Sequence, residues 1–119
     1  MTGLKTKIST PRVEESVEFY SRWFGMDVLE SWDEPEDRGV ILGFSTPEAE
    51  AFLEIYHCER LGSYDAISLQ FRVDSAEAFI RSIRGQVEFR GPTPRPWGSL
   101  YVYLTDPSGI QIVVYEGGL

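Results

Sequence analysis

Hydrophobic and polar residues alternate one by one in four stretches of the chain, and this period of two predicts strands. In residues 67–73 (ISLQFRV), for example, every second side chain is apolar. The apolar side chains of such a strand face a buried layer, and the polar ones face the other side. The four predicted strands span residues 5–10, 67–73, 100–104 and 110–114.

Two other stretches repeat apolar residues at helical spacing and carry helix-capping signals at their ends. The first follows Thr10-Pro11, and Gly25 stands where a C-terminal cap belongs. The second begins with residues 74–77 (DSAE), which form a capping-box pattern, and ends at Gly85. We therefore predict two amphipathic helices, each with its apolar face against a sheet.

Matched residues recur at a fixed distance along the chain, Phe19 with Phe79 and Gly25 with Gly85. Such a period indicates two copies of one structural unit, and each copy reads as a strand, a helix and three more strands. We expect an α+β fold in one domain, residues 1–119. Its two βαβββ repeats span about 4–57 and 66–116, and the last two strands of each repeat are joined by residues 45–48 and 105–109.

Charge and composition limit the partners of the protein. The 119 residues carry a formal net charge of −8, which repels nucleic-acid backbones and anionic membrane surfaces. No apolar stretch approaches the roughly 20 residues that a membrane-spanning helix needs. The single cysteine, Cys58, and an N-terminus without an apolar signal core favour a cytoplasmic location. We expect a small organic molecule as partner, and neither nucleic acid nor a membrane.

Two motifs carry a family resemblance. The first helix contains S-x-x-F-Y-x-x-x-x-G from Ser16 to Gly25, and the late turn 104–112 contains D-P-S-G. In combination these motifs resemble the vicinal-oxygen-chelate superfamily, which includes glyoxalase I, bleomycin-resistance proteins and extradiol dioxygenases. The resemblance implies paired βαβββ modules that form a curved mixed sheet around a concave cavity. It also implies a homodimer with the cavity at or near the interface.

The positions that the resemblance assigns to metal ligands depart from the pattern of metal-dependent members. Those members use His or Glu on the first, fourth, fifth and eighth strands, where this sequence has Lys5, Glu54, Ser68 and Val113. Stable divalent sites generally need about three or four protein ligands. We therefore expect no metal and no other cofactor, and we judge metal-dependent glyoxalase or dioxygenase activity to be excluded by this substitution pattern.

The same alternation assigns one polar and aromatic face to the predicted strands. Tyrosines interspersed with amides, hydroxyls and charges suit a flat organic ligand with hydrogen-bonding groups. The alternative is a face that is merely solvated or buried in a dimer. The predicted ligand-binding residues are Lys5, Lys7, Glu54, Tyr56, Ser68, Gln70, Arg72, Trp97, Tyr101, Tyr103 and Val113.

Two groups among these residues allow both a functional and a structural interpretation. Lys5 and Glu54 form either a charge substitute for the missing cation or an ordinary structural ion pair. The proline-rich segment 91–98 is predicted to be a stiff loop that lays Trp97 and Arg95 over a ligand. In the alternative, this loop is only a structural connection.

These observations favour a metal-independent small-molecule-binding protein of the bleomycin-resistance type, with no catalytic residue. It would sequester an antibiotic, a toxin or another aromatic or polar compound in a dimer cavity. The alternative is a metal-free isomerase or lyase in which Glu54 or a tyrosine transfers a proton while Lys5 or Arg72 stabilises negative charge. A third hypothesis is a dimeric interaction module without a small ligand.

Overall fold

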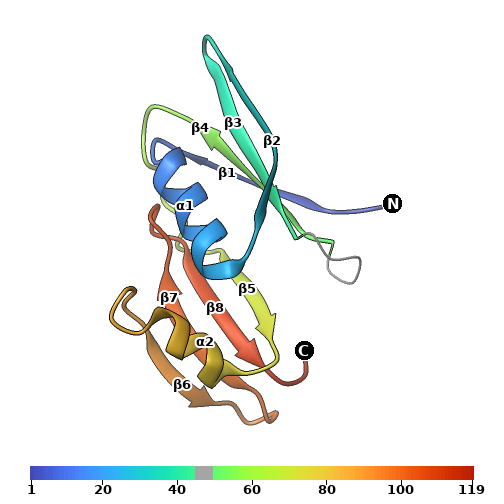
Figure 1. Cartoon of the computed structure of the whole chain (residues 1–119), viewed down its shortest axis with the longest axis vertical. Coiled ribbons are helices and arrows are strands. Elements are labelled where there is room, and N and C mark those ends of the chain that lie inside the picture. Colours follow the sequence, from blue (N-terminus) through green and yellow to red (C-terminus); the bar gives the residue numbers. More distant parts are fainter. Residues whose placement is uncertain (45–49) are drawn as a thin grey trace. The chain divides into compact units, whose positions relative to one another are not determined.

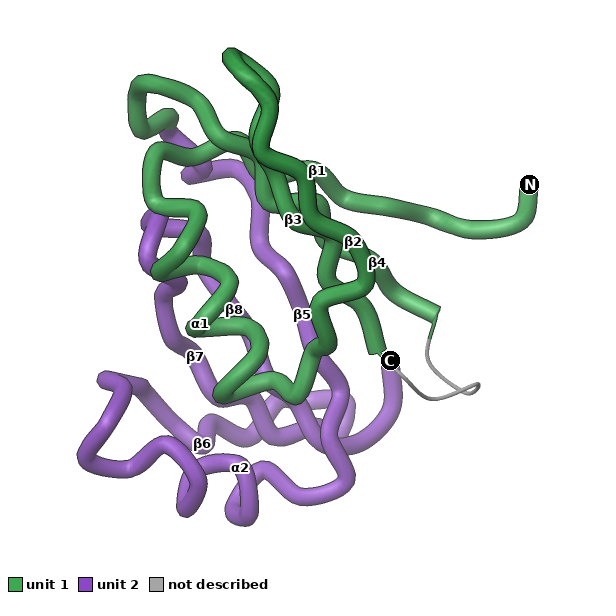
Figure 2. The backbone as a smooth tube through the Cα atoms, turned by 45° about the horizontal axis from the view of Figure 1, so that its top comes forward, with its two compact units in different colours: residues 1–62 green, residues 63–119 purple. Residues whose placement is uncertain are grey.

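The computed structural model describes residues 1–44 and 50–119 and divides the chain into two compact units. Unit 1 spans Met1–Gly62 and unit 2 spans Ser63–Leu119, coloured separately in Figure 2. The boundary falls between the two repeats predicted from the sequence. The connection expected at residues 45–48 lies outside the described residues.

Unit 1 contains one helix and a four-stranded mixed sheet (Figure 1). Its strand order is β1-β4-β3-β2, with β1 parallel to β4 and the other neighbours antiparallel. The elements are β1 (Lys5–Thr10), α1 (Val13–Phe24), β2 (Asp27–Glu34), β3 (Asp37–Gly43) and β4 (Phe52–His57).

Unit 2 repeats this topology with the strand order β5-β8-β7-β6, in which β5 and β8 are parallel. Its elements are β5 (Ser68–Val73), α2 (Ala76–Ile83), β6 (Arg90–Pro94), β7 (Leu100–Thr105) and β8 (Gln111–Glu116). The predicted α+β class and the paired βαβββ modules are confirmed. Each module forms a sheet of its own.

The helix ends follow the capping signals of the sequence, with one difference. Ser75 caps α2 by accepting a hydrogen bond from the backbone N–H of Ala78, at 3.1 Å. Gly25 ends α1 in the left-handed conformation, where a side chain would be strained. The expected Thr10 cap is wrong, because Thr10 belongs to β1 and its hydroxyl accepts from the backbone N–H of Arg12, one residue before α1 begins.

Each helix buries its apolar face on the sheet of its own unit. In unit 1, α1 packs on β3 and β4 and buries Tyr20 completely between them, together with Leu42 and Ile55. In unit 2, α2 packs on β7 and β8 and buries Ile83, with Ile112 below it. The opposite face of each sheet is therefore the one left for a ligand. Within the described residues, neither helix is long and apolar enough to cross a membrane.

The structure corrects the interpretation of the proline-rich segment. Residues 90–94 form the edge strand β6, with a register irregularity between Arg90 and Thr93, and only the part after Pro94 is a loop. An edge position explains how a strand tolerates proline, which lacks the N–H needed by a central strand. The Gly91–Pro92 peptide bond is cis.

Candidate functional site

The strand register of unit 1 places four of the predicted binding residues on one sheet face. Lys7 lies opposite Glu54 between β1 and β4, and Tyr56 lies opposite Gly39 between β4 and β3. Lys5 precedes Lys7 by two positions and so shares its face. This face is the one turned away from α1.

Glu54 sits between the two lysines of this face. Its Oε1 lies 3.0 Å from the Lys5 Nζ and its Oε2 lies 3.9 Å from the Lys7 Nζ. The Glu54 side chain is only 13% exposed, whereas each lysine is about half exposed. A carboxylate acts as a general base most readily when it is unpaired in an apolar cavity. The two lysines remove that condition for Glu54.

A second polar group on this face is built around Asp37, at the start of β3. Asp37 Oδ1 accepts a hydrogen bond from the indole Nε1 of Trp32, at 2.9 Å, and the carboxylate also accepts from the hydroxyl of Tyr56. A Cβ on Gly39 would stand 2.6 Å from the Trp32 ring, so only glycine leaves room for the indole at this point. Lys7 Nζ lies 4.1 Å from the centre of the Tyr56 ring.

We expect Asp37→Asn to lower the pKa of Tyr56. The hydrogen bond to the Asp37 carboxylate is the main cause that raises this pKa, ahead of desolvation and the charge of Glu54. A raised pKa in the folded state means that Tyr56 contributes stability below about pH 10 that is lost as the pH rises through the folded-state pKa. Ultraviolet titration of the tyrosines measures the shift, with Tyr56→Phe identifying the Tyr56 contribution. An unchanged titration in Asp37→Asn would contradict the hydrogen bond.

A pocket of about 440 Å³ lies in unit 1 between α1 and the hairpin of β2 and β3. Its floor includes Val13, Val17 and Val40. At its rim, Arg38 pairs with Glu14 of α1. The pKa of the Glu14 carboxyl is lowered because the backbone N–H of Glu14 donates a hydrogen bond to it and because Arg38 also donates to it. None of the residues predicted to bind a ligand lines this pocket.

Unit 2 presents an aromatic sheet face, and Tyr101 is at its centre. The Tyr101 ring lies 5.8 Å from Trp97, 6.0 Å from Tyr103 and 5.9 Å from Tyr115, measured between ring centres. Tyr101 and Tyr115 are opposite each other in β7 and β8, and Arg72 of β5 continues that row. The predicted residues Trp97, Tyr101, Tyr103 and Arg72 therefore share one face. We use the name aromatic face for the cluster of four rings on it, which are Trp97, Tyr101, Tyr103 and Tyr115.

The remaining predicted residues of unit 2 are placed on the same face but differ in accessibility. Gln70 lies opposite Val113, and its amide Nε2 donates to the hydroxyl of Ser68 at 3.3 Å. Val113 is buried, with 3% of its surface exposed. Val113 is thus covered by the neighbouring side chains, whereas Gln70 is exposed to solvent.

Two arginines lie over the aromatic face. The guanidinium carbon of Arg90 is 4.8 Å from the Tyr103 ring centre, and that of Arg95 is 4.9 Å from the Trp97 ring centre. Arg95 also lies 5.6 Å from Tyr101. Arginine prefers such stacked positions because its planar group is weakly hydrated. The backbone of Arg95 is held in place by a hydrogen bond from its N–H to the Ser99 carbonyl, at 2.8 Å.

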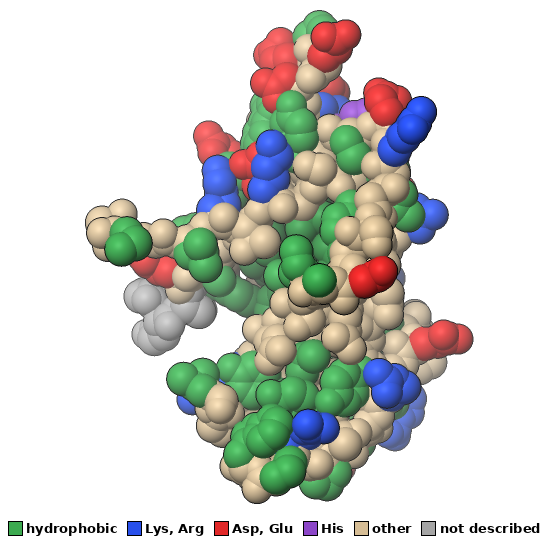
Figure 3. Space-filling view, turned by 180° about the vertical axis from the view of Figure 1, so that it is seen from behind, with side chains coloured by type: hydrophobic (Ala, Val, Ile, Leu, Met, Phe, Trp, Pro, Cys, Tyr) green, Lys and Arg blue, Asp and Glu red, His purple; other side chains and the backbone are tan. Residues whose placement is uncertain are grey.

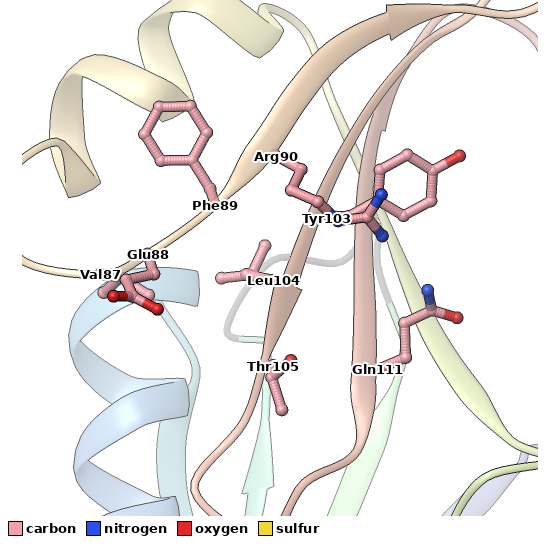
Figure 4. A pocket seen from close by; sticks show the side chains of 8 residues that line it. All are labelled: Val87, Glu88, Phe89, Arg90, Tyr103, Leu104, Thr105 and Gln111. Carbon is pink, nitrogen blue, oxygen red and sulfur yellow. The ribbon is translucent and has the colours of Figure 1, made fainter.

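A pocket of about 670 Å³ adjoins this face at the start of β6 (Figure 4). Arg90 reaches across it towards the Tyr103 ring, and Gln111 and Thr105 lie on the same side, further along the strands. Glu88 and Phe89, from the segment before β6, line the opposite wall. A ring stacked on Tyr103 would therefore have hydrogen-bonding groups next to it.

The sequence of residues 4–114 matches the model of the Glyoxalase/Bleomycin resistance protein/Dioxygenase superfamily. The chain belongs to this superfamily. The match covers both units, and it confirms the resemblance to vicinal-oxygen-chelate proteins that the two motifs indicated.

Curated relatives of the chain include lactoylglutathione lyases of plants. A protein named as such from Brassica oleracea var. gemmifera is 30% identical over 117 residues, which cover 89% of this chain and 41% of the relative. Lactoylglutathione lyase GLX1 from Arabidopsis thaliana is 29% identical, with the same shares covered. The chain thus spans about two fifths of the length of these relatives.

Solved structures of lower identity share the fold. Fosfomycin resistance protein FosX from Listeria monocytogenes has a TM-score of 0.81 at 14% identity, with 100% of this chain and 96% of that chain covered. The antibiotic-binding protein TnmS3 from Streptomyces sp. CB03234 has a TM-score of 0.77 at 20% identity, with 99% of both chains covered. At these identities the likeness establishes the fold alone.

The side chains at the four family positions for metal ligands do not fit a divalent cation. Glu54 is already paired with two ammonium groups, and the buried side chain of Val113 has no donor atom. The Ser68 hydroxyl accepts from Gln70. Within residues 1–44 and 50–119, no three His, Cys, Asp or Glu side chains lie together in a way that would hold a metal ion.

Several residues around the two faces were missed by the sequence interpretation. Asp37 belongs to the acidic run 33–37, and such a run is more often a solvated loop than a site. The bonds of Asp37 to Trp32 and Tyr56 depend on pairing between strands. Arg90 was missed because residues 91–94, the rest of its strand, were taken for part of a loop. Tyr115 was not among the predicted binding residues, and its contact with Tyr101 gives it a place in the aromatic face.

Proposed function

We propose that the protein binds a planar organic molecule on the aromatic face of unit 2, without the help of a metal. The observation that carries this proposal is the contact of Trp97, Tyr103 and Tyr115 with Tyr101 on a single sheet face. Trp97 is 54% exposed, so its ring is available to a ligand. Stacked or edge-on aromatic contacts are worth about 0.5–1.5 kcal/mol each beyond the area that they bury.

Three further observations support this function. The pocket beside Tyr103 has the size of a small-molecule site. The family includes a structurally similar protein described as antibiotic-binding. The side chains at the family positions for metal ligands, Lys5, Glu54, Ser68 and Val113, do not favour binding of a divalent metal. Binding alone would serve to sequester an antibiotic or a toxin.

We expect Tyr103→Ala to weaken binding of a naphthalene probe, 2-naphthylmethanol, by about two- to tenfold. The reason is the loss of one aromatic contact of about 0.5–1.5 kcal/mol. Isothermal titration calorimetry of the full chain measures the change in dissociation constant. Carrying it out in the presence of EDTA also tests whether binding is independent of metal. Lys7→Ala is the comparison variant, and we expect a smaller effect because Lys7 is half exposed and lies in unit 1.

The proposal fails if the probe does not bind, or if binding requires an added divalent metal. It also fails if Lys7→Ala weakens binding more than Tyr103→Ala. In that case the lysine-rich face of unit 1 would be the binding site.

The 30% identity to a lactoylglutathione lyase favours one alternative, a metal-free isomerase or lyase. In that alternative a tyrosine or Glu54 moves the proton, and Lys5 or Arg72 stabilises the developing charge. Turnover of lactoylglutathione by the purified chain in EDTA, measured in both directions by the absorbance of its thioester, tests this directly. Turnover that is lost in Glu54→Gln would establish the alternative, and we expect no turnover.

A further inference from the structure

The negative charge of the chain is distributed unequally between its two units. Unit 1 contains thirteen acidic and six basic residues, whereas unit 2 contains six acidic and five basic residues. Unit 1 therefore carries −7 of the net charge and unit 2 carries −1. Figure 3 shows acidic side chains gathered over the turn between β2 and β3, at the top of unit 1. The charge of the whole chain is a poor guide to the ligand of unit 2.

The aromatic face of unit 2 carries positive charge and no carboxylate. Arg90 and Arg95 lie over its rings, and Arg72 continues the row of Tyr101 and Tyr115. The ion pairs found among residues 1–44 and 50–119 include none of these three arginines. Arg81, on α2, shows the contrast, because it pairs with Glu77 at 3.4 Å.

Arg95 also has a buried donor that the described residues leave without a hydrogen bond. Its Nε atom is buried and has no partner, while its guanidinium group stacks between Trp97 and Tyr101. Leaving a buried donor unsatisfied is unfavourable. An acceptor that arrives with a ligand would remove this cost, and an anion would do so most strongly because charge-assisted hydrogen bonds are the strong ones.

The pocket beside Tyr103 offers a second group of donors on the side of Arg90, and Glu88 on the opposite wall is the one carboxylate of its lining. Arg90 lies at its mouth, and the Gln111 amide and Thr105 hydroxyl lie within the same lining. The planar fork of an arginine matches the two oxygens of a carboxylate. A ligand with its ring on Tyr101 or Tyr103 would thus hold an acidic group against a guanidinium.

We propose that the aromatic face selects planar organic anions, with Arg90 and Arg95 as the residues that determine this charge specificity. This inference rests on the function proposed above and adds the chemical class of its ligand. The rings hold the flat part of the molecule, and the arginines discriminate between acids and their neutral or cationic analogues.

Three probes with the same ring test the charge preference. They are 2-naphthoate, 2-naphthylmethanol and 2-naphthylmethylammonium, each titrated into the full chain by calorimetry. We expect 2-naphthoate to bind at least about tenfold more tightly than the alcohol, and the ammonium compound to bind most weakly. The preference for the acid should fall severalfold in Arg90→Gln and in Arg95→Gln.

Arg81→Gln is the matched control, because it removes the same charge from unit 2 at a distance from the aromatic face. It should leave the preference unchanged. Arg95→Lys keeps the charge but not the planar fork, and it should retain only part of the preference. Thermal melts of all variants verify that they are folded.

The outcomes separate this inference from the function on which it rests. If the three probes bind equally, or the ammonium compound binds best, the charge specificity is wrong while binding by the aromatic face stands. An equal loss of preference in Arg81→Gln also overturns the specificity, because overall charge would then explain it. If none of the probes binds, both proposals fail together.

Discussion

Replacing Tyr20 with alanine is expected to destabilise unit 1 by about 3–5 kcal/mol, the range typical of large aromatic deletions in a protein core. Tyr20 is fully buried on the inner face of α1. Its ring lies 5.1 Å from Phe19 and 5.9 Å from Phe24, measured between ring centres. Removing it leaves a cavity that these neighbours fill only in part. Urea unfolding followed by circular dichroism measures the loss.

Trp23→Ala is the control for this experiment, since Trp23 belongs to the same helix but is only half-buried, with Arg22 stacked 4.6 Å from its ring centre. We expect a loss of no more than about 1.5 kcal/mol there. If Tyr20→Ala prevents folding altogether, Tyr20→Phe keeps the ring and still reports on the site. An equal loss in the Ala variants of Tyr20 and Trp23 would contradict the packing of α1 on β3 and β4.

The elements of the fold were largely predictable, because they depend on local patterns. Alternation over 5–10 gave the bounds of β1, and the signals at Ser75 and Gly25 gave one end of each helix. The edge strand β6 was the main failure. It contains two prolines and a glycine within five residues, and local propensity argues against a strand there. Pairing with Tyr101 and Tyr103 in β7 overrides that propensity.

For the candidate site, the sequence predicted only which side chains share a sheet face. Alternation correctly placed Lys7, Glu54 and Tyr56 on one face of unit 1, because the period of a strand is fixed. Which of these side chains contact each other depends on register between strands far apart in the sequence. The bond from Trp32 to Asp37 and the position of Arg90 over Tyr103 both arise in this way. A single sequence carries little information about such pairings.

The second large effect is expected for Asp106, at the start of the turn between β7 and β8. Its Oδ1 accepts hydrogen bonds from the backbone N–H groups of Ser108, at 2.9 Å, and Ile110, at 2.8 Å. Asp106, Ser108 and Ile110 are each no more than 4% exposed, so water does not replace these bonds easily. Leaving a buried donor unsatisfied costs about 1–3 kcal/mol. We expect Asp106→Ala to destabilise unit 2 by about 2–4 kcal/mol, measured by urea unfolding.

Asp106→Asn separates the hydrogen bonds from the packing of this turn. The amide oxygen of asparagine accepts the same two hydrogen bonds without the charge, so we expect it to lose less than half as much stability as alanine. The Gly109 conformation, at φ +92°, and its bond to the Asp106 carbonyl do not depend on the side chain at 106. Hydrogen exchange gives the sharper readout: the Ser108 and Ile110 amides should lose protection in Asp106→Ala and keep it in Asp106→Asn. Equal protection in both variants would show that other contacts hold the turn, and that the D-P-S-G motif is not fixed by its aspartate.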